Sequence, residues 1–254
     1  MVSGKVATGI TGRNWADSLD TVIKVLNDKD GKDKTLKVIQ YTGKLILWAG
    51  ARKPLKATFD SYPIANRIDP LVSNLSGFRK TIRLGNWLST GRAMIKAGLE
   101  EAEWIDFIDL YTEICDDLYL LAKIGTVSFR DAKVHKRWVE IFDREACRGW
   151  FLAIIINLYG EYKKRLTIER KIQAEVRQKD SEKQGTLVDS STASELSKLH
   201  QARWMSQINL AKLLCDFIFC AIDVFEADIN PVVQIVTGLT SGSIGYYKLY
   251  KKML

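Results

Sequence analysis

Apolar side chains recur at helical spacing along most of this chain. Bulky apolar positions lie three or four apart over six segments: 15–26, 32–48, 70–97, 101–124, 134–178 and 196–225. That period is typical of amphipathic α-helices. No β-branched run with period two and no hairpin signal of the Asn-Gly type is present, so strands are not expected. The pattern predicts an all-α protein, a helical bundle.

Two stretches interrupt the helical pattern. Three of the four prolines fall between positions 54 and 70. Because proline removes a helix hydrogen bond, Lys53 to Asp69 is predicted to be an irregular linker, and Pro70 suits the first position of the next helix. Asp180 to Glu195 is polar and rich in Ser and Thr, which predicts a flexible linker. The expected regions are therefore 1–69, 70–125, 126–179, 180–195 and 196–254.

The charge balance indicates which kind of partner surface the protein would bind. The 254 residues carry 38 Lys and Arg against 30 Asp and Glu, a formal net charge of +8. Hydrophobic residues make up 46% of the chain, an ordinary globular proportion that excludes a disordered or collagen-like protein. The basic excess indicates an acidic partner, such as anionic lipid, nucleic acid or an acidic protein. No helix-turn-helix, RNP or zinc-finger signature accompanies it, so no nucleic-acid partner is expected.

The segment that starts at Pro70 concentrates this basic charge. No Asp or Glu occurs from 71 to 99. Helical geometry separates an apolar face from a basic side, the first holding Leu71, Leu75, Phe78 and Ile82 and the second Arg79, Lys80 and Arg83. An adjoining apolar stripe holds Leu84, Leu88, Ile95 and Leu99, with Arg92 and Lys96 intruding on it. This composition is typical of a helix lying in a membrane surface, and the other interpretation is a bundle helix with a solvated basic face.

The next predicted helix has the opposite charge. Eight acidic residues and no Lys or Arg occur between positions 100 and 117. Such a helix can pair with the preceding basic helix in the same chain or in a neighbouring copy. A simple solvated acidic face is the third interpretation.

No run of 18 or more strongly apolar residues marks an obvious membrane span. Residues 229–247 are the first candidate because they carry no charge, and a second apolar stretch, 149–160, is too short to cross a bilayer alone. A buried core helix is therefore favoured for 149–160. Gly238, Gly242 and Gly245 are small residues at helical spacing, and such residues let two helices approach closely. This spacing predicts either self-association or close packing within a bundle.

Residues for catalysis or metal binding are not grouped in this sequence. The four cysteines form no Cys-x-x-Cys pair, the two histidines are far apart, and no P-loop, G-x-G-x-x-G or G-x-S-x-G motif is present. We expect reduced core cysteines, no enzymatic activity, no cofactor and no bound metal. The first residues contain no continuous apolar run, so no secretory signal peptide is expected.

Four stretches follow one another in a specific order. They are Gly31-Lys32-Asp33-Lys34 with Gln40-Tyr41, Arg79-Lys80-Thr81-Ile82-Arg83-Leu84-Gly85, Asp117-Leu118-Tyr119-Leu120-Leu121, and the glycine-rich stretch 238–249. Together they resemble the peroxin-eleven family of peroxisome-proliferation membrane proteins, with Lys32 where Arg is usual. The first resembles the family's G-R-D-K and Q-Y signature, and the second its Arg-Lys-x-x-Arg-Leu-Gly amphipathic helix. The resemblance runs from about residue 19 to 252.

The resemblance implies a peroxisomal membrane protein, or one of a peroxisome-derived organelle, with both termini cytosolic. Its amphipathic helix would insert in the cytosolic leaflet of an anionic phospholipid membrane, bend it and elongate the organelle before fission. Self-association and work with a fission adaptor and a dynamin-type GTPase are also implied. The matching positions are Arg79, Lys80 and Arg83 for lipid phosphate contact and Leu75, Phe78 and Ile82 for the apolar wedge.

The expected architecture is therefore an all-α helical bundle membrane protein. It has a basic amphipathic surface helix and one or two weakly hydrophobic membrane segments, with a span at 229–247. Two other functions stay open. One is a non-selective metabolite channel of the peroxisomal membrane, for which Asp216, Asp223 and Glu226 are the pore-lining candidates. The other is a soluble α-helical adaptor without a span.

Overall fold

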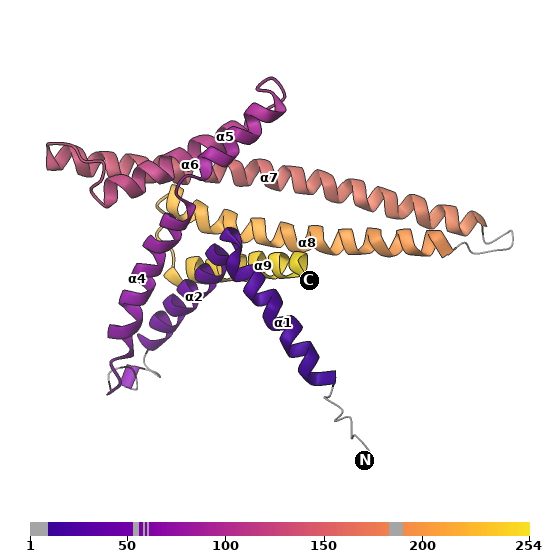
Figure 1. Cartoon of the computed structure of the whole chain (residues 1–254), viewed down its shortest axis with the longest axis horizontal. Coiled ribbons are helices and arrows are strands. Elements are labelled where there is room, and N and C mark those ends of the chain that lie inside the picture. The colour runs from indigo at the N-terminus through magenta and orange to yellow at the C-terminus, as the bar shows by residue number, and fades with distance from the viewer. Residues whose placement is uncertain (1–9, 53–55, 58, 60, 183–189) are drawn as a thin grey trace, which may run out of the picture. The chain divides into compact units, whose positions relative to one another are not determined.

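The protein is α-helical throughout the part that the structure describes. The computed structural model describes residues 10–52, 56–57, 59, 61–182 and 190–254, and these contain no strand (Figure 1). The long helices are α1 (Ile10–Asn27), α2 (Lys29–Gly50), α4 (Ile64–Arg83), α5 (Asn86–Ala97), α6 (Trp104–Lys123), α7 (Ala132–Glu182), α8 (Ser190–Val224) and α9 (Pro231–Met253). The predicted all-α class is confirmed.

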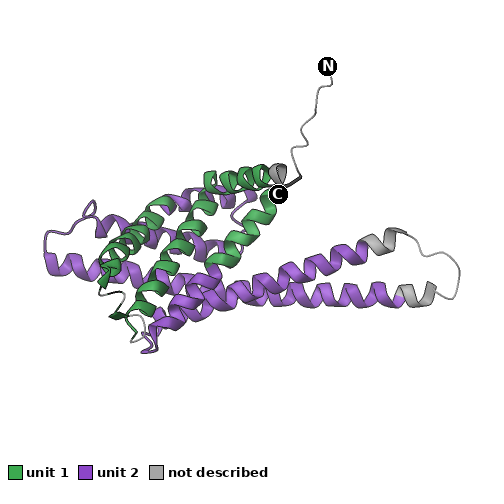
Figure 2. Ribbon diagram, turned by 90° about the horizontal axis from the view of Figure 1, so that it is seen from below, with its two compact units in different colours: residues 1–82, 242–254 green, residues 83–241 purple. Residues whose placement is uncertain are grey.

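The chain forms two compact units, shown in different colours in Figure 2. The first comprises Met1–Ile82 and Gly242–Leu254, and the second Arg83–Ser241. The boundaries fall inside α4 and α9, so each of these helices contributes residues to both units.

The first unit begins with a tight turn between α1 and α2. Asp28 caps α2, and its carboxylate accepts a hydrogen bond of 2.9 Å from the Gly31 N–H. An added Cβ on Gly31 would overlap the carbonyl oxygen of Val25, which is fully buried. A second close approach brings α4 onto α2, because a Cβ on Gly43 would lie 2.6 Å from the Val72 side chain. A side chain at either position would therefore force a neighbouring group to move.

The second unit is organised around the two longest helices. The helical pattern at 134–178 is compatible with one helix or with two that meet near Gly149 or Gly160, and the structure has one helix, α7, which runs beside α8 along much of its length (Figures 1 and 2). The Cys220 thiol donates to the Cys147 carbonyl at 3.4 Å, and Arg203 pairs with Glu169 at 3.0 Å. These contacts fix an antiparallel register. On its other side α7 packs against α6, where a Cβ on Gly149 would overlap the Thr112 hydroxyl.

The helix predicted from Pro70 to Ala97 is wrong in two respects. α4 begins earlier, at Ile64, so Pro70 lies inside it, and residues 64–69 are not an irregular linker. The helix also breaks at Gly85, whose φ of 80° is left-handed, and restarts as α5 at Asn86. Glycine takes this backbone conformation without steric strain, so the basic segment is two helices.

The predicted polar linker 180–195 lies partly outside the described residues. Residues 183–189 are not described, whereas 180–182 belong to α7 and 190–195 to α8. The ends of that segment are therefore helical. Within 53–69, residues 53–55, 58 and 60 likewise lie outside the described part of the chain.

Candidate membrane-binding site

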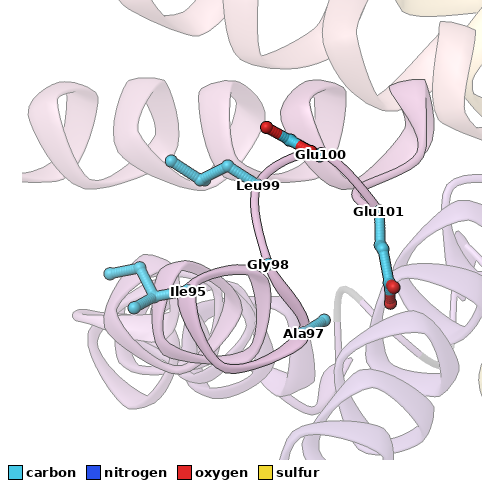
Figure 3. Close-up of a pocket in the computed structure, with 6 residues that line it drawn as sticks. All are labelled: Ile95, Ala97, Gly98, Leu99, Glu100 and Glu101. Atoms are coloured by element: carbon cyan, nitrogen blue, oxygen red, sulfur yellow. The ribbon is translucent and has the colours of Figure 1, made fainter.

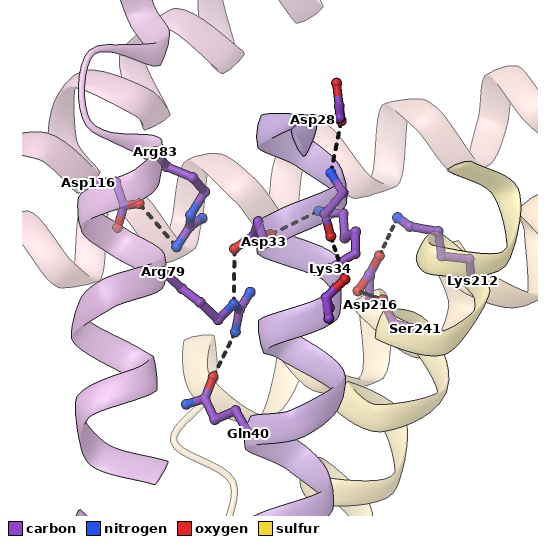
Figure 4. A network of polar contacts seen from close by, with 12 residues as sticks. Asp28, Asp33, Lys34, Gln40, Arg79, Arg83, Asp116, Lys212, Asp216 and Ser241 are labelled. Atoms are coloured by element: carbon purple, nitrogen blue, oxygen red, sulfur yellow. Dashed lines mark hydrogen bonds and ion pairs between the residues drawn. The ribbon is translucent and has the colours of Figure 1, made fainter. Parts of the chain in front are cut away.

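Arg79, expected to contact lipid phosphate, lies on the side of α4 that faces α2. Its guanidinium donates to the Asp33 carboxylate at 2.9 Å and to the Gln40 side-chain oxygen at 2.8 Å (Figure 4). The side chains of Arg79 and Asp33 are 13% and 5% exposed. A buried carboxylate needs such a partner, because an unpaired charge is costly in a low dielectric. Arg79 therefore anchors α4, and two of the motif segments meet in space.

The other predicted residues of α4 divide between the packed side and the surface. Phe78 is 53% exposed and so is available as part of a wedge. Leu75, Ile82 and Lys80 are half-buried. Tertiary packing thus turns Arg79 toward α2 rather than onto a free basic face. Contact with lipid phosphate by Arg79, Lys80 and Arg83, and the apolar wedge of Leu75, Phe78 and Ile82, stay predictions.

In the second unit, two adjacent acids of α6 hold the break between α4 and α5. The Asp117 carboxylate accepts from the Gly85 N–H at 2.8 Å, and Asp116 forms an ion pair of 3.5 Å with Arg83. The predicted basic and acidic helices are thus paired within this chain. Arg83, expected at lipid phosphate, is engaged here.

Asp117→Ala is expected to destabilise the Gly85 turn far more than Asp116→Ala. The first change removes a charged acceptor from a partly buried N–H, which costs about 2 kcal/mol. The second removes a partly exposed pair worth less than about 1 kcal/mol. Hydrogen exchange at the Gly85 amide measures the difference. Equal acceleration in both variants would contradict the role assigned to Asp117.

α5 has an apolar face that nothing covers within the second unit. Leu88 and Ile95 are 60% and 74% exposed, while Met94 of the same helix is buried. Arg92 and Lys96 are exposed on the same short helix. We call Leu88, Arg92, Ile95 and Lys96 the α5 face. It combines bulky apolar groups with basic charge, the chemistry that an anionic membrane surface binds.

The side of α5 opposite the α5 face is fixed to α6. Thr90 donates to Glu113 at 2.7 Å, so the helix cannot rotate freely about its axis. Glu103 and Asp106 form a capping box at the start of α6. Helix α6 therefore supports α5 with the Leu88 and Ile95 side chains directed away from it.

A hollow lies at the turn between α5 and α6 (Figure 3). Its lining residues are Ile95, Ala97, Gly98, Leu99, Glu100 and Glu101. Gly98 has a φ of 98°, which lets the chain reverse direction. The carboxylates of Glu100 and Glu101 point in different directions (Figure 3), so they do not converge as a general acid–base pair.

Burial raises the pKa of several groups on α6, among them Asp109 and Cys115. Partial burial, with a smaller contribution from the Asp106 carboxylate, raises the pKa of Asp109. Burial also raises the pKa of the Cys115 thiol, which keeps it protonated and unreactive at neutral pH. All four cysteines are free thiols.

The C-terminal glycines lie at packed positions. A Cβ on Gly242 would lie 3.2 Å from the Lys37 side chain, and one on Gly245 would lie 3.2 Å from Lys34. Both contacts are with α2 in the first unit. Gly238 is also buried, in the second unit. The structure thus uses Gly242 and Gly245 for close packing within the chain, one of the two alternatives that the sequence left open, and self-association through them stays a prediction.

One helix in the described part of the chain is long and apolar enough to cross a membrane, and it is not the expected one. It comprises Glu195–Val224 of α8, whose most apolar stretch has a mean hydropathy of 1.4 with only 17% of its residues buried. Helix α9, which holds most of the span expected at 229–247, does not meet the same criterion.

Polar groups on α8 pair with one another. Lys212 and Asp216 form an ion pair of 2.7 Å one helical turn apart, and Ser241 of α9 donates to the same carboxylate (Figure 4). Asp216 is buried. Of the other pore-lining candidates, Asp223 accepts from Gln234 at 2.5 Å and Glu226 is exposed beyond the helix end. The three acids therefore occupy three different environments.

These features define an α-helical protein with one helix able to cross a membrane and an exposed apolar and basic surface on a short helix. Residues 19–250, nearly the whole chain, match the family model of peroxisomal biogenesis factor 11 (PEX11), and the chain belongs to this family. The resemblance seen in the sequence is confirmed. Family membership gives it a role in peroxisome biogenesis and proliferation and an association with peroxisomes. Neither the curated proteins nor the solved structures include a match.

Proposed function

We propose that this chain is a non-enzymatic membrane-remodelling protein that elongates the peroxisomal membrane before fission. The observation that carries the proposal is the α5 face, where Leu88 and Ile95 stand exposed beside Arg92 and Lys96. A side chain inserted at headgroup depth expands one leaflet relative to the other, and that difference in area bends the bilayer. Phe78 of α4 supplies a further exposed apolar group.

Charge supports the same orientation toward anionic lipid. The segment 71–99 contains no acid, so every charge it presents attracts phosphate. Each Lys or Arg near such a surface contributes about 1 kcal/mol, and Arg92 with Lys96 together increase the affinity about thirtyfold. This shifts the expected lipid contacts from Arg79 and Arg83, which are paired inside the chain, toward the α5 face.

The remaining parts of the proposal follow from the family. Both termini lie in the cytosol, and the bound leaflet is the cytosolic one. The partners are anionic phospholipid, further copies of this chain, a fission adaptor and a dynamin-type GTPase, without a cofactor. When several copies bind one membrane, the differences in leaflet area that they cause add together. The summed curvature supports a tubule rather than isolated dimples.

Leu88→Ser with Ile95→Ser is expected to reduce membrane tubulation at least tenfold. Burying two such side chains in lipid is worth about 3–6 kcal/mol, so their loss removes the wedge. The full-length protein is reconstituted in anionic and in neutral vesicles at a matched protein-to-lipid ratio, and tubules are counted by electron microscopy. Wild-type protein is expected to form tubules on anionic vesicles.

Two further variants separate the apolar and electrostatic contributions. Arg92→Gln with Lys96→Gln should make anionic vesicles behave like neutral ones, while Val176→Ser removes an exposed apolar group of α7 and should leave tubulation unchanged. Tubulation by the Leu88→Ser, Ile95→Ser protein at the wild-type frequency would overturn the proposal.

A further inference from the structure

Helices α7 and α8 are joined by contacts that keep them in one antiparallel register. Besides the contacts at Cys147 and Arg203, the Asn209 side chain donates to Glu161 at 2.7 Å. Phe151 stacks with Phe217 at a ring-centroid distance of 5.2 Å. The apolar segment 149–162 of α7 therefore lies beside the apolar half of α8.

Large aliphatic side chains of this pair lie on its outer surface, while its interior mixes apolar and polar groups. Between 149 and 162 and between 205 and 222, the buried positions include Ile154, Leu213 and Cys220 but also Glu161, Ser206 and Asp216. The exposed large hydrophobic positions include Leu152, Ile155, Ile156, Leu214 and Ile218. In water these exposed side chains would be unfavourable, whereas in hydrocarbon each would be in its preferred solvent.

Every charged group within the apolar half of α8 has a partner. Lys212 and Asp216 cancel each other one turn apart, and Ser241 satisfies a further carboxylate lone pair. Ionisable groups inside a membrane are tolerated when they pair and face the protein interior. The pair therefore leaves the stretch without net charge, even though its sequence contains two ions.

The ends of the apolar surface have the composition of membrane interfaces. Trp204 of α8 is exposed at one end and Phe225 at the other. Tyr159 and Tyr162 of α7 are exposed between the level of Trp204 and the aliphatic positions, as the Glu161–Asn209 and Glu169–Arg203 contacts show. Lys163 lies over the Tyr159 ring at 4.3 Å, just beyond the aliphatic segment. Amphipathic aromatic rings and basic groups concentrate at headgroup level. From Trp204 to Phe225 a helix rises about 31 Å, and a hydrocarbon core is about 30 Å thick.

We propose that α7 and α8 enter the bilayer together as an antiparallel hairpin. The hydrocarbon surrounds Leu152, Ile155 and Ile156 of α7 and Leu214 and Ile218 of α8, and the occupant of this surface is lipid acyl chain. The segment 149–162, too short to cross alone, is accompanied by the longer apolar stretch of α8. This assignment differs from the span expected at 229–247, and it does not rest on the α5 face.

A substitution on the outward surface of α8 tests the proposal. Leu214→Arg with Ile218→Arg is expected to reduce at least tenfold the fraction of full-length protein that stays with reconstituted vesicles after alkaline carbonate extraction. Val176→Arg, on α7 beyond the aromatic band, replaces an equally exposed apolar group and should behave as wild type. On a water-exposed surface, both changes would be harmless.

A second measurement on unsubstituted protein guards against a folding defect in the double variant. A phospholipid with a photoreactive group on its acyl chain should label 152–156 and 214–218 at least ten times more than 163–177. Complete carbonate release of the wild type, or uniform labelling of these segments, would overturn the hairpin. Either result leaves the tubulation test of the α5 face intact, because surface insertion needs no span.

Discussion

Arg79→Met is expected to lower the free energy of unfolding by about 3 kcal/mol, because the buried Asp33 carboxylate loses one of its cationic partners, Lys34 being another at 3.1 Å. The guanidinium meets both Asp33 and Gln40, so the substitution also leaves a buried amide oxygen without its donor. Hydrogen exchange of α2 and α4 in neutral detergent, in the absence of anionic lipid, measures the loss. Arg67→Met, at an exposed position of the same helix, should change stability by less than about 0.5 kcal/mol.

Two additional variants define what Arg79 does. Arg79→Lys keeps the charge but lacks the planar fork that contacts two acceptors at once, so an intermediate loss is expected. Asp33→Asn should weaken the effect of Arg79→Met, because the buried negative charge that Arg79 stabilises is then gone. If Arg79→Met retains full stability without lipid and only weakens binding to anionic vesicles, Arg79 is a lipid ligand and its anchoring role is wrong.

Gly31→Ala is expected to destabilise the α1–α2 turn by about 3 kcal/mol, since the added methyl overlaps the Val25 backbone carbonyl, which cannot move as a side chain can. Gly77→Ala is the matched control in the same unit. No atom lies within 4 Å of a Cβ at Gly77, and alanine is the better helix former by about 0.5–1 kcal/mol. Thermal unfolding followed by circular dichroism compares the two variants. The same shift for both would show that backbone propensity, rather than the contact with Val25, decides the effect.

The α5 face illustrates how much of the candidate site the sequence predicts. Helical periodicity alone assigns Leu88 and Ile95 to one apolar stripe, with Arg92 and Lys96 beside it. It did not indicate whether this stripe or the one through Leu75 and Ile82 is covered. Packing makes the difference, because Leu75 and Ile82 are half-buried, whereas Leu88 and Ile95 are exposed, as are Leu71 and Phe78 of the first stripe.

Asp33 and Gln40 are the residues that sequence reasoning missed as partners of Arg79. Both belong to the first segment of the family resemblance, so a signal was present, but it gave no indication of which distant residue each one meets. An ion pair across 46 positions depends on how α2 and α4 pack. Periodicity describes one helix at a time and contains no information about such pairing.

The sequence does not single out α8 as a membrane span, for a related reason. A search for stretches without charge favours 229–247, while Lys212 and Asp216 interrupt the more apolar segment. Their spacing of one helical turn was visible in the sequence and permitted an ion pair. That the Asp216 carboxylate is buried and also accepts from Ser241 is decided by the tertiary structure.

Sequence by itself determined the all-α class, the helical character of 134–178, the absence of acid between 71 and 99, and the family, because each depends on local composition or on the order of short motifs. The tertiary structure decided that 134–178 lies in one helix, α7, that the basic segment breaks at Gly85 and that Arg79 anchors α4. It also decided that Leu88 and Ile95 of the α5 face are exposed and that Asp216 is buried in the α7–α8 pair. These properties depend on which faces meet, and packing between segments distant in the chain selects those faces.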